Sequence, residues 1–252
     1  MTRKIAIITG GASGIGLACA ERLAADGMKV VIADMNEKTG TEQAKRLAGD
    51  FVLSNLSKRD DCKHLVDETL KKHGTVHVLV NNAGYQHVSP IEDFPEDQWE
   101  RMIFLMLTAP FLLTRYCWPA MKQQQWGRIV NMGSIHALIA SPFKAGYIAA
   151  KHGLIGLTRT SALEGGEFGI TANALCPAYV RTPLVDNQIA DQAKANNMSP
   201  AEVIEKIMLA PAAVKRLIEP AEVAGFVSYL CSEAAGTITG SALTMDLGWT
   251  AR

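Results

Sequence analysis

The fold of this chain is decided by its opening stretch, Lys4-Ile5-Ala6-Ile7-Ile8-Thr9-Gly10-Gly11-Ala12-Ser13-Gly14-Ile15-Gly16. The unbroken apolar run from Ile5 to Ile8 predicts a strand buried on both faces, as in parallel sheets. Glycines crowd the residues after it, and a helical pattern begins at Leu17. This arrangement suits a pyrophosphate, because backbone N–H groups and the helix dipole face the anion. The stretch therefore predicts an α/β fold that holds a dinucleotide.

Composition narrows the class of protein further. The chain has 252 residues, with 25 Lys and Arg balanced by 25 Asp and Glu, so neither nucleic acid nor an anionic membrane is expected as the main partner. The five cysteines are odd in number and scattered, which fits neither a disulfide framework nor a metal site and favours a reducing, cytoplasmic location. No signal peptide precedes the first strand, and no apolar run approaches membrane-spanning length. We expect one domain over residues 1–252.

An acidic residue ends the second predicted strand, Lys29–Ala33. Asp34 lies eighteen residues after Gly16, where a dinucleotide fold places a carboxylate on the adenosine ribose. A carboxylate there repels a 2′-phosphate, and neither Ser13 nor Met35 supplies the cation that such a phosphate requires. NAD is therefore favoured over NADP. The alternative is a solvated aspartate at the end of a strand.

A second cluster of small residues follows the strand predicted over residues 76–80. It reads Asn81-Asn82-Ala83-Gly84. Small residues let the backbone approach a cofactor, and asparagine side chains brace strand ends by hydrogen bonds. An ordinary turn also uses Asn and Gly, but its spacing from the glycine turn favours the cofactor interpretation.

The second half of the chain carries the residues for acid–base chemistry. Ser134 follows the strand Arg128–Met132, and thirteen residues later Tyr147 and Lys151 stand four apart on one helix face. Oxidising an alcohol needs a base, and a free phenol titrates near pH ~10. An ammonium about 4 Å away stabilises phenolate by roughly 4 kcal/mol. This interaction predicts that Lys151 lowers the pKa of Tyr147 by about 2 to 3.

Together these motifs resemble the signatures of the short-chain dehydrogenase/reductase family along the whole chain. The resemblance implies a doubly wound, Rossmann-type three-layer α/β sandwich with a seven-stranded parallel sheet in the order 3-2-1-4-5-6-7. It implies Ser134, Tyr147 and Lys151 as catalytic residues and NAD as the cofactor. The predicted cofactor-binding residues are Gly10, Ser13, Gly14, Ile15, Gly16, Asp34, Asn55, Leu56, Asn82, Ala83, Gly84, Tyr147, Lys151, Pro177, Val180 and Thr182.

The chain departs from the family pattern at three positions. Asn55 stands where the family usually has the Asp that meets adenine, and an amide oxygen still accepts that hydrogen bond. Ala178 stands where the family has Gly. Met106 stands where the family has an Asn that shapes a proton path, and a thioether cannot replace that amide. Met106 thus predicts a different proton route, slower turnover or another task.

The remaining clues concern the substrate. The polar, helix-prone insertion Pro183–Arg216 exceeds thirty residues and predicts a mobile lid. The pocket resembles that of the D-3-hydroxybutyrate dehydrogenases within the family, with Lys144 supplying charge for a small carboxylate. The predicted substrate-binding residues are Gln86, Ser134, His136, Lys144, Tyr147, Gln188 and Trp249. Taken singly, Lys144 is equally a solvated loop lysine, His136 structural, Gln188 an ordinary lid residue and Trp249 an interface plug.

Two long helices complete the prediction. The segment Glu96–Gln124 is mostly helical, with Pro110 and Pro119 expected to bend or interrupt it. The helix over residues 147–160 is apolar on all sides apart from Lys151 and Arg159, which predicts packing against a second copy in a homodimer or homotetramer.

Two rival functions remain open at this stage. The first is another reductase of the same fold, acting on a 3-oxoacyl thioester, a sugar, a steroid or another secondary alcohol. The second is a protein that binds NAD as a sensor without turnover. Met106 is the feature that favours the sensor, and the intact Ser134, Tyr147 and Lys151 oppose it.

Overall fold

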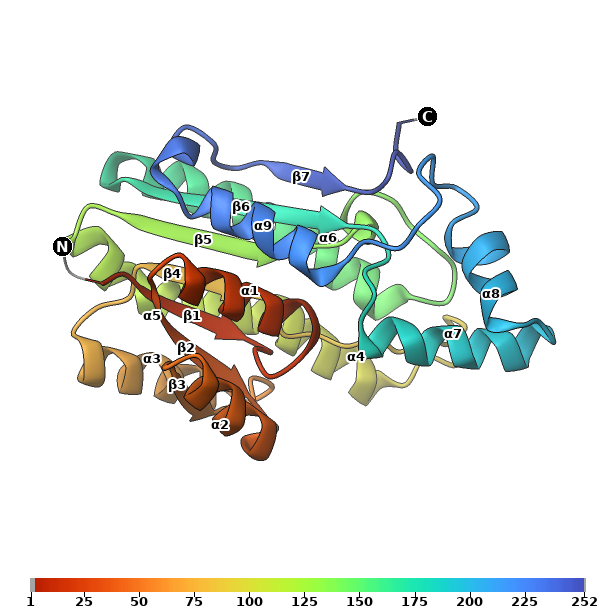
Figure 1. Cartoon of the computed structure of the whole chain (residues 1–252), viewed down its shortest axis with the longest axis horizontal. Helices are drawn as coiled ribbons and strands as arrows, with labels where there is room; N and C mark the ends of the chain where they lie inside the picture. The colour runs from red at the N-terminus through yellow and green to blue at the C-terminus, as the bar shows by residue number, and fades with distance from the viewer. Residues whose placement is uncertain (1–2, 252) are drawn as a thin grey trace.

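Seven parallel strands within residues 3–251, the part of the chain that the structure describes, form one sheet (Figure 1). The structure is a computed structural model. Along the sheet the strands follow the order β3-β2-β1-β4-β5-β6-β7, and every neighbouring pair is parallel. The strands are β1 Ile5–Thr9, β2 Lys29–Asp34, β3 Asp50–Leu53, β4 Val78–Asn81, β5 Gly127–Met132, β6 Ile170–Pro177 and β7 Ala242–Met245. The predicted doubly wound fold and its strand order are confirmed.

Helices cover both faces of this sheet. α1, α2 and α9 contribute to the core on one face, and α3, α5 and α6 to the core on the other. The α-helices are α1 Gly14–Ala25, α2 Glu37–Arg46, α3 Arg59–His73, α4 Glu96–Ile103, α5 Ala109–Gln123, α6 Ala145–Gly165, α7 Pro183–Asn196, α8 Pro200–Val203 and α9 Pro220–Leu230. Within β1, Ala6 and Ile8 join the first core while Ile5 and Ile7 join the second. The run is apolar throughout because strand side chains alternate between two buried faces.

The long helix in the middle of the chain is interrupted by a π-helical turn. Phe104–Thr108 separates α4 from α5, and Pro110 lies in the first turn of α5. Proline lacks an N–H and its ring clashes with a carbonyl one turn earlier, so a widened turn before it relieves both problems. Pro119 lies inside α5, which continues to Gln123. The predicted interruption therefore occurs before Pro110, whereas α5 continues through Pro119 without a break.

This long helical stretch is also more apolar than the sequence analysis predicted. Glu96–Gln123 has the length and apolar composition of a span, with 44% of its most apolar eighteen residues buried inside the protein. The prediction that no apolar run approaches that length was wrong. Met102, Leu112 and Met121 are fully buried in the protein core, which accounts for the apolar composition.

The carboxyl ends of the strands share one edge of the sheet, and the segment after β6 lies beyond this edge (Figure 1). α7, α8 and the π-helical turn Ile204–Met208 follow one another there. They bury a small apolar cluster of their own, formed by Val185, Ile189, Val203 and Met208. The helix-prone character of the predicted lid is therefore confirmed over residues 183–208.

Candidate active site

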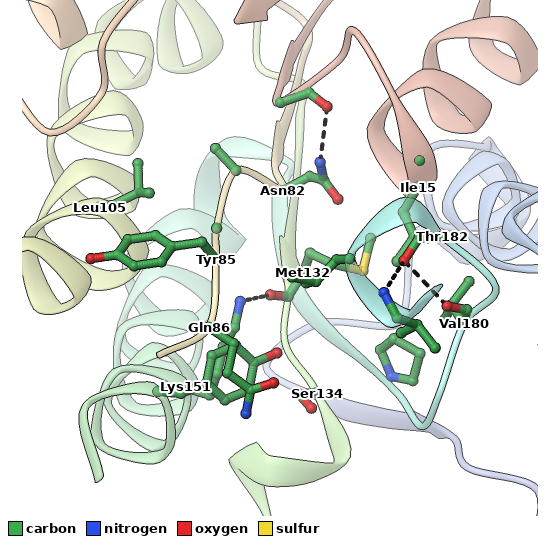
Figure 2. Close-up of a pocket in the computed structure, with 18 of the residues that line it drawn as sticks. Ile15, Asn82, Tyr85, Gln86, Leu105, Met132, Ser134, Lys151, Val180 and Thr182 are labelled. Carbon is green, nitrogen blue, oxygen red and sulfur yellow. Dashed lines mark hydrogen bonds between the residues drawn. The ribbon is translucent and has the colours of Figure 1, made fainter. Parts of the chain in front are cut away.

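A cavity of about 450 Å³ opens at the carboxyl edge of the sheet. Its size is within the usual range for sites that hold cofactors and small substrates. Figure 2 shows Ile15 and Thr182 on one side of it and Gln86 and Lys151 on the other. The predicted site residues that line it are Gly10, Ser13, Gly14, Ile15, Asp34, Leu56, Asn82, Ala83, Gly84, Gln86, Ser134, His136, Lys144, Tyr147, Lys151, Pro177, Val180, Thr182 and Gln188. Segments distant in sequence thus converge as the motifs predicted.

Three predicted residues lie outside this lining. A Cβ at Gly16 would come within 2.1 Å of the Gly10 carbonyl oxygen, so Gly16 lets α1 pack against the turn instead of touching a ligand. Asn55 accepts a hydrogen bond from the Ser57 N–H with its side chain, at 3.1 Å. Trp249 packs behind the wall, with its ring centroid 6.4 Å from that of His136. For these three, the expected ligand contact is absent from the lining.

Several lining residues carried no clear signal in the sequence. Tyr179 is one, with its ring centroid 5.9 Å from that of Trp249 and 6.0 Å from the Lys144 Nζ. Its place two residues after the Pro177 that ends β6 is the clue that was available, because strand ends border the site. The other lining residues that were not predicted include Met35, Tyr85, Leu105, Met132, Ile135, Leu184 and Val185.

The glycine turn after β1 is braced by the segment after β4. Gly10 and Gly14 have φ values of 63° and 55°, which side chains disfavour. Asn82 donates from Nδ2 to the Thr9 carbonyl at 2.9 Å and to the Gly10 carbonyl at 3.4 Å (Figure 2), and the Thr9 hydroxyl accepts from the Asn82 and Ala83 N–H groups at 2.8 and 3.0 Å. The two cofactor motifs are therefore one structural unit, as the bracing role of the asparagines predicted.

The helix that follows this turn presents its N-terminus to the cavity. Ser13 is the N-cap of α1 and makes no side-chain capping bond, and the first turn contains no acidic residue. The unsatisfied N–H groups of such a helix end attract an anion. Together with the left-handed glycines Gly10 and Gly14, this N-terminus fits the pyrophosphate of a dinucleotide.

Asp34, the last residue of β2, places its carboxylate beside the glycine turn. Its two oxygens accept hydrogen bonds from the backbone N–H groups of Ala12 and Asn36, at 3.1 and 3.0 Å. The carboxylate is therefore fixed beside the cavity. Among the described lining residues, the lysine and arginine side chains are those of Lys144 and Lys151, which belong to the catalytic and substrate end. No cationic lining residue accompanies Asp34.

The three predicted catalytic residues meet in one place. Ser134 follows β5 and hydrogen-bonds to the Tyr147 hydroxyl. Lys151 donates from Nζ to the Met132 carbonyl at 2.6 Å (Figure 2), and its Nζ lies 5.5 Å from the centroid of the Tyr147 ring. The Tyr147 oxygen, which would exchange a proton with the substrate, therefore lies beside the Ser134 hydroxyl, which can hold the substrate oxygen.

The ionisation of this group differs from the prediction. Burial raises the pKa of Tyr147, and the hydrogen bond with Ser134 opposes that rise. Burial also lowers the pKa of Lys151 to about 8. The predicted drop in the phenol pKa from Lys151 alone was wrong, because burial raises this pKa and Lys151 is not among the groups that oppose the rise. Any lowering must come from a further positive charge over the site.

Met106 occupies the centre of the π-helical turn and is 1% exposed. A Cβ at Gly84 would come within 3.1 Å of its sulfur, and Met102, Ala150 and Tyr147 pack in the same apolar cluster. The thioether fills this side of the site without offering a strong hydrogen-bonding group. Met106 therefore puts an apolar side chain in the position where the family has an asparagine.

The substrate end of the cavity is rich in donors. Gln188 donates from Nε2 to the Gln86 Oε1 at 2.6 Å, so α7 is joined to the loop after β4. The Gln86 Nε2 is buried and has no hydrogen-bond partner within residues 3–251. Burial and the nearby Lys144 lower the pKa of His136 to about 4, which leaves the imidazole neutral at pH 7. An unpartnered buried N–H in the same cavity as a lysine favours an anionic ligand.

Comparisons with known proteins agree with this arrangement. A family described as enoyl-(acyl carrier protein) reductase matches residues 10–250. A D-beta-hydroxybutyrate dehydrogenase of Rhizobium meliloti (strain 1021) is 43% identical over 99% of both chains, and an uncharacterised oxidoreductase of Bacillus subtilis (strain 168) is 40% identical over 100% of both. The crystal structure of an actinorhodin polyketide ketoreductase with NADPH is 31% identical, has a TM-score of 0.93, and is matched over 98% of this chain and 97% of that one. The chain therefore belongs to the short-chain dehydrogenase/reductase family of oxidoreductases.

Proposed function

We propose that this protein is an NAD-dependent dehydrogenase that interconverts a small 3-hydroxy acid and its 3-oxo acid, with D-3-hydroxybutyrate and acetoacetate as the first pair to test. The observation that carries the proposal is a cavity that holds both a lysine and a buried amide N–H with no hydrogen-bond partner within residues 3–251. Lys144 and the unpartnered Gln86 Nε2 lie in the same cavity as Ser134 and Tyr147. The R. meliloti relative supports the same substrate class.

The chain's own residues divide the work between binding and proton transfer. The α1 N-terminus and glycine turn would hold the pyrophosphate, and Asp34 the adenosine ribose. NAD, when bound, supplies the hydride acceptor and a positive charge. Ser134 holds the substrate oxygen, and Tyr147 takes the hydroxyl proton in the oxidative direction or returns it in the reverse direction. Lys151, anchored on the Met132 carbonyl, places a cation beside the phenol.

The carboxylate proposal is tested at Lys144. Lys144→Gln removes a half-buried charge from the wall of the cavity and should lower kcat/KM for D-3-hydroxybutyrate about 30-fold, since a charge-assisted hydrogen bond contributes about 2 kcal/mol. Initial rates at 340 nm with NAD give the values. A neutral secondary alcohol should be affected less than about threefold. An equal loss on both substrates would mean that Lys144 does not recognise a carboxylate.

A 3-oxoacyl thioester reductase is the second candidate. The family description and the NADPH-bound polyketide ketoreductase favour it. Asp34 and the absence of a cationic lining residue beside it favour NAD instead. A panel of hydroxy acids, acyl thioesters, sugars and neutral alcohols with each cofactor separates these enzymes, and NAD binding with no turnover of any of them would identify a sensor.

The preference for NAD predicts a specific exchange at the end of β2. Asp34→Ser combined with Met35→Arg removes the carboxylate and adds a cation beside it. Met35 is 66% exposed, so the arginine is tolerated. The ratio of kcat/KM for NAD to that for NADP should fall by about 100-fold or more, because repulsion becomes attraction. Met35→Arg alone is the matched control and should change the ratio less, since Asp34 then pairs with the new cation.

Self-association, a lid and a cytoplasmic location complete the proposal. We expect a homodimer or homotetramer, because Phe111 on α5 and Leu163 on α6 are 46% and 86% exposed. Sedimentation as a monomer would contradict it.

We infer that residues 183–216 act as the lid, supported by the Gln188 to Gln86 bond. Five free, buried cysteines support a reducing compartment. Neither nucleic acid nor a membrane is proposed as a partner.

A further inference from the structure

Phe143 has a left-handed backbone, with φ 66°. A bulky side chain rarely adopts this conformation, because the Cβ crowds the backbone, and such strain persists only where the surroundings hold it. The ring does not offset the strain by burial, since the side chain is 55% exposed. What holds the residue is its carbonyl, which accepts a hydrogen bond from the Ser89 N–H at 2.9 Å.

The other strained residues provide a comparison. Within residues 3–251, positive φ values outside glycine also occur at Ala48, Gln125, Asn197 and Leu247. The first three follow or end the helices α2, α5 and α7, where a left-handed residue is the ordinary way to terminate a helix. Phe143 instead precedes a helix, so this explanation does not apply to it.

The residue after Phe143 is the lysine of the proposed carboxylate site. Lys144 is the N-cap of α6, and its carbonyl accepts the first helical bond from the Ile148 N–H at 2.9 Å. The chain therefore turns from the loop into α6 at residues 143 and 144. This turn places Lys144 in the wall of the cavity.

The same peptide unit also joins two loops. Ser89, which bonds to the Phe143 carbonyl, lies three residues after Gln86 on the loop that follows β4. One strained residue thus adjoins the lysine and is tied to the loop that carries the unpartnered amide. Phe143 is therefore linked to Lys144 by the chain and to the Gln86 loop by one hydrogen bond.

We propose that Phe143 is a positioning residue, whose left-handed backbone sets the distance between Lys144 and Gln86 and so fixes the geometry of anion recognition. The aromatic ring of Phe143 is not needed for this positioning, which depends on the backbone. Glycine adopts the conformation without strain and alanine with the same Cβ crowding as phenylalanine, whereas β-branched valine resists it more strongly. The inference depends on the proposed carboxylate substrate for its kinetic test but not for its chemical test.

The kinetic test compares Phe143→Gly, Phe143→Ala and Phe143→Val. Valine should raise the KM for D-3-hydroxybutyrate about tenfold with kcat changed less than about twofold, while glycine and alanine leave KM within about threefold. Ala48→Val is the matched control, because it places the same residue at φ 48° in an exposed position after α2. It should lower the melting temperature without changing KM.

The chemical test needs no substrate. Acetylation of Lys144 by acetic anhydride, followed by mass spectrometry, reports how well the cavity shields its amine. The rate should match wild type in Phe143→Gly and Phe143→Ala and rise at least about threefold in Phe143→Val, with Ala48→Val unchanged. If no hydroxy acid is oxidised, the proposed function fails while this test still decides the positioning role. An unchanged rate in Phe143→Val, or an equal rise in Phe143→Gly, would overturn it.

Discussion

Replacing Tyr147 with phenylalanine is expected to lower kcat/KM for the hydroxy acid by about 1,000-fold or more. The hydroxyl is the group placed to take the substrate proton, and general acid–base catalysis contributes about 10²- to 10⁴-fold. Its hydrogen bond with Ser134 is lost at the same time. The ring and its packing against Met106 stay in place, so the loss falls on chemistry and not on folding. Initial rates at 340 nm measure it.

Cofactor binding provides the control for this variant. The affinity for NADH, measured by fluorescence titration, should stay within about fivefold, because deleting a single hydroxyl contact costs about 1 kcal/mol or less. Tyr229→Phe, which removes a hydroxyl from a residue that is 44% exposed on α9, should leave the rate unchanged. Substantial activity in Tyr147→Phe would assign the proton transfer to another group, and loss of NADH binding would indicate a structural defect.

Replacing Lys151 with methionine should lower activity about 100-fold or more while making the protein more stable. The side chain is 5% exposed, and burial lowers the pKa of its amine to about 8 from the ordinary 10.5. At pH 7 the charged form therefore costs folding about 3 kcal/mol. The hydrogen bond to the Met132 carbonyl returns about 1 kcal/mol. The net gain in the variant should be about 2 kcal/mol, measured by urea unfolding.

The stability difference between Lys151→Met and wild type should change with pH in a defined direction. Between pH 8 and 10.5 the unfolded chain binds a proton at Lys151 that the folded chain does not, so the contribution of this residue to wild-type stability rises with pH across that window. The advantage of Lys151→Met should therefore be full below pH 8 and shrink above it. Lys38→Met, at an exposed site on α2, should show neither effect. A variant less stable than wild type at pH 7 would show that the ammonium is not strained.

Much of the fold was predictable because it follows from local rules. The run Ile5–Ile8 had to be a doubly buried strand, and the glycines after it had to make a turn. The sheet order came from the family resemblance, since pairing between distant strands leaves little local trace. The π-helical turn at Phe104–Thr108 was not predicted, because its residues suit an α-helix equally well and the widened turn depends on the proline that follows and on tertiary packing.

Part of the candidate site was also predictable from the sequence. Residues at strand ends, such as Ser134 and Asp34, could be placed because parallel strands all end at one edge. The packing role of Gly16 was not predicted, because a glycine that permits close packing looks the same in sequence as one that touches a ligand. Direct contact of Trp249 with the cavity depends on how the last turn packs, which no local pattern encodes. The direction of the Tyr147 pKa shift depended on burial, which only coordinates reveal.

The hydrogen bond between Gln188 and Gln86 has a thermodynamic consequence. Gln86 accepts from Gln188 through one end of its amide and offers an unused N–H at the other. An acceptor that binds this N–H polarises the amide and strengthens its second bond. By reciprocity, a helix α7 that is already docked holds that acceptor more firmly. Binding of an acceptor at Gln86 and docking of α7 should thus favour each other.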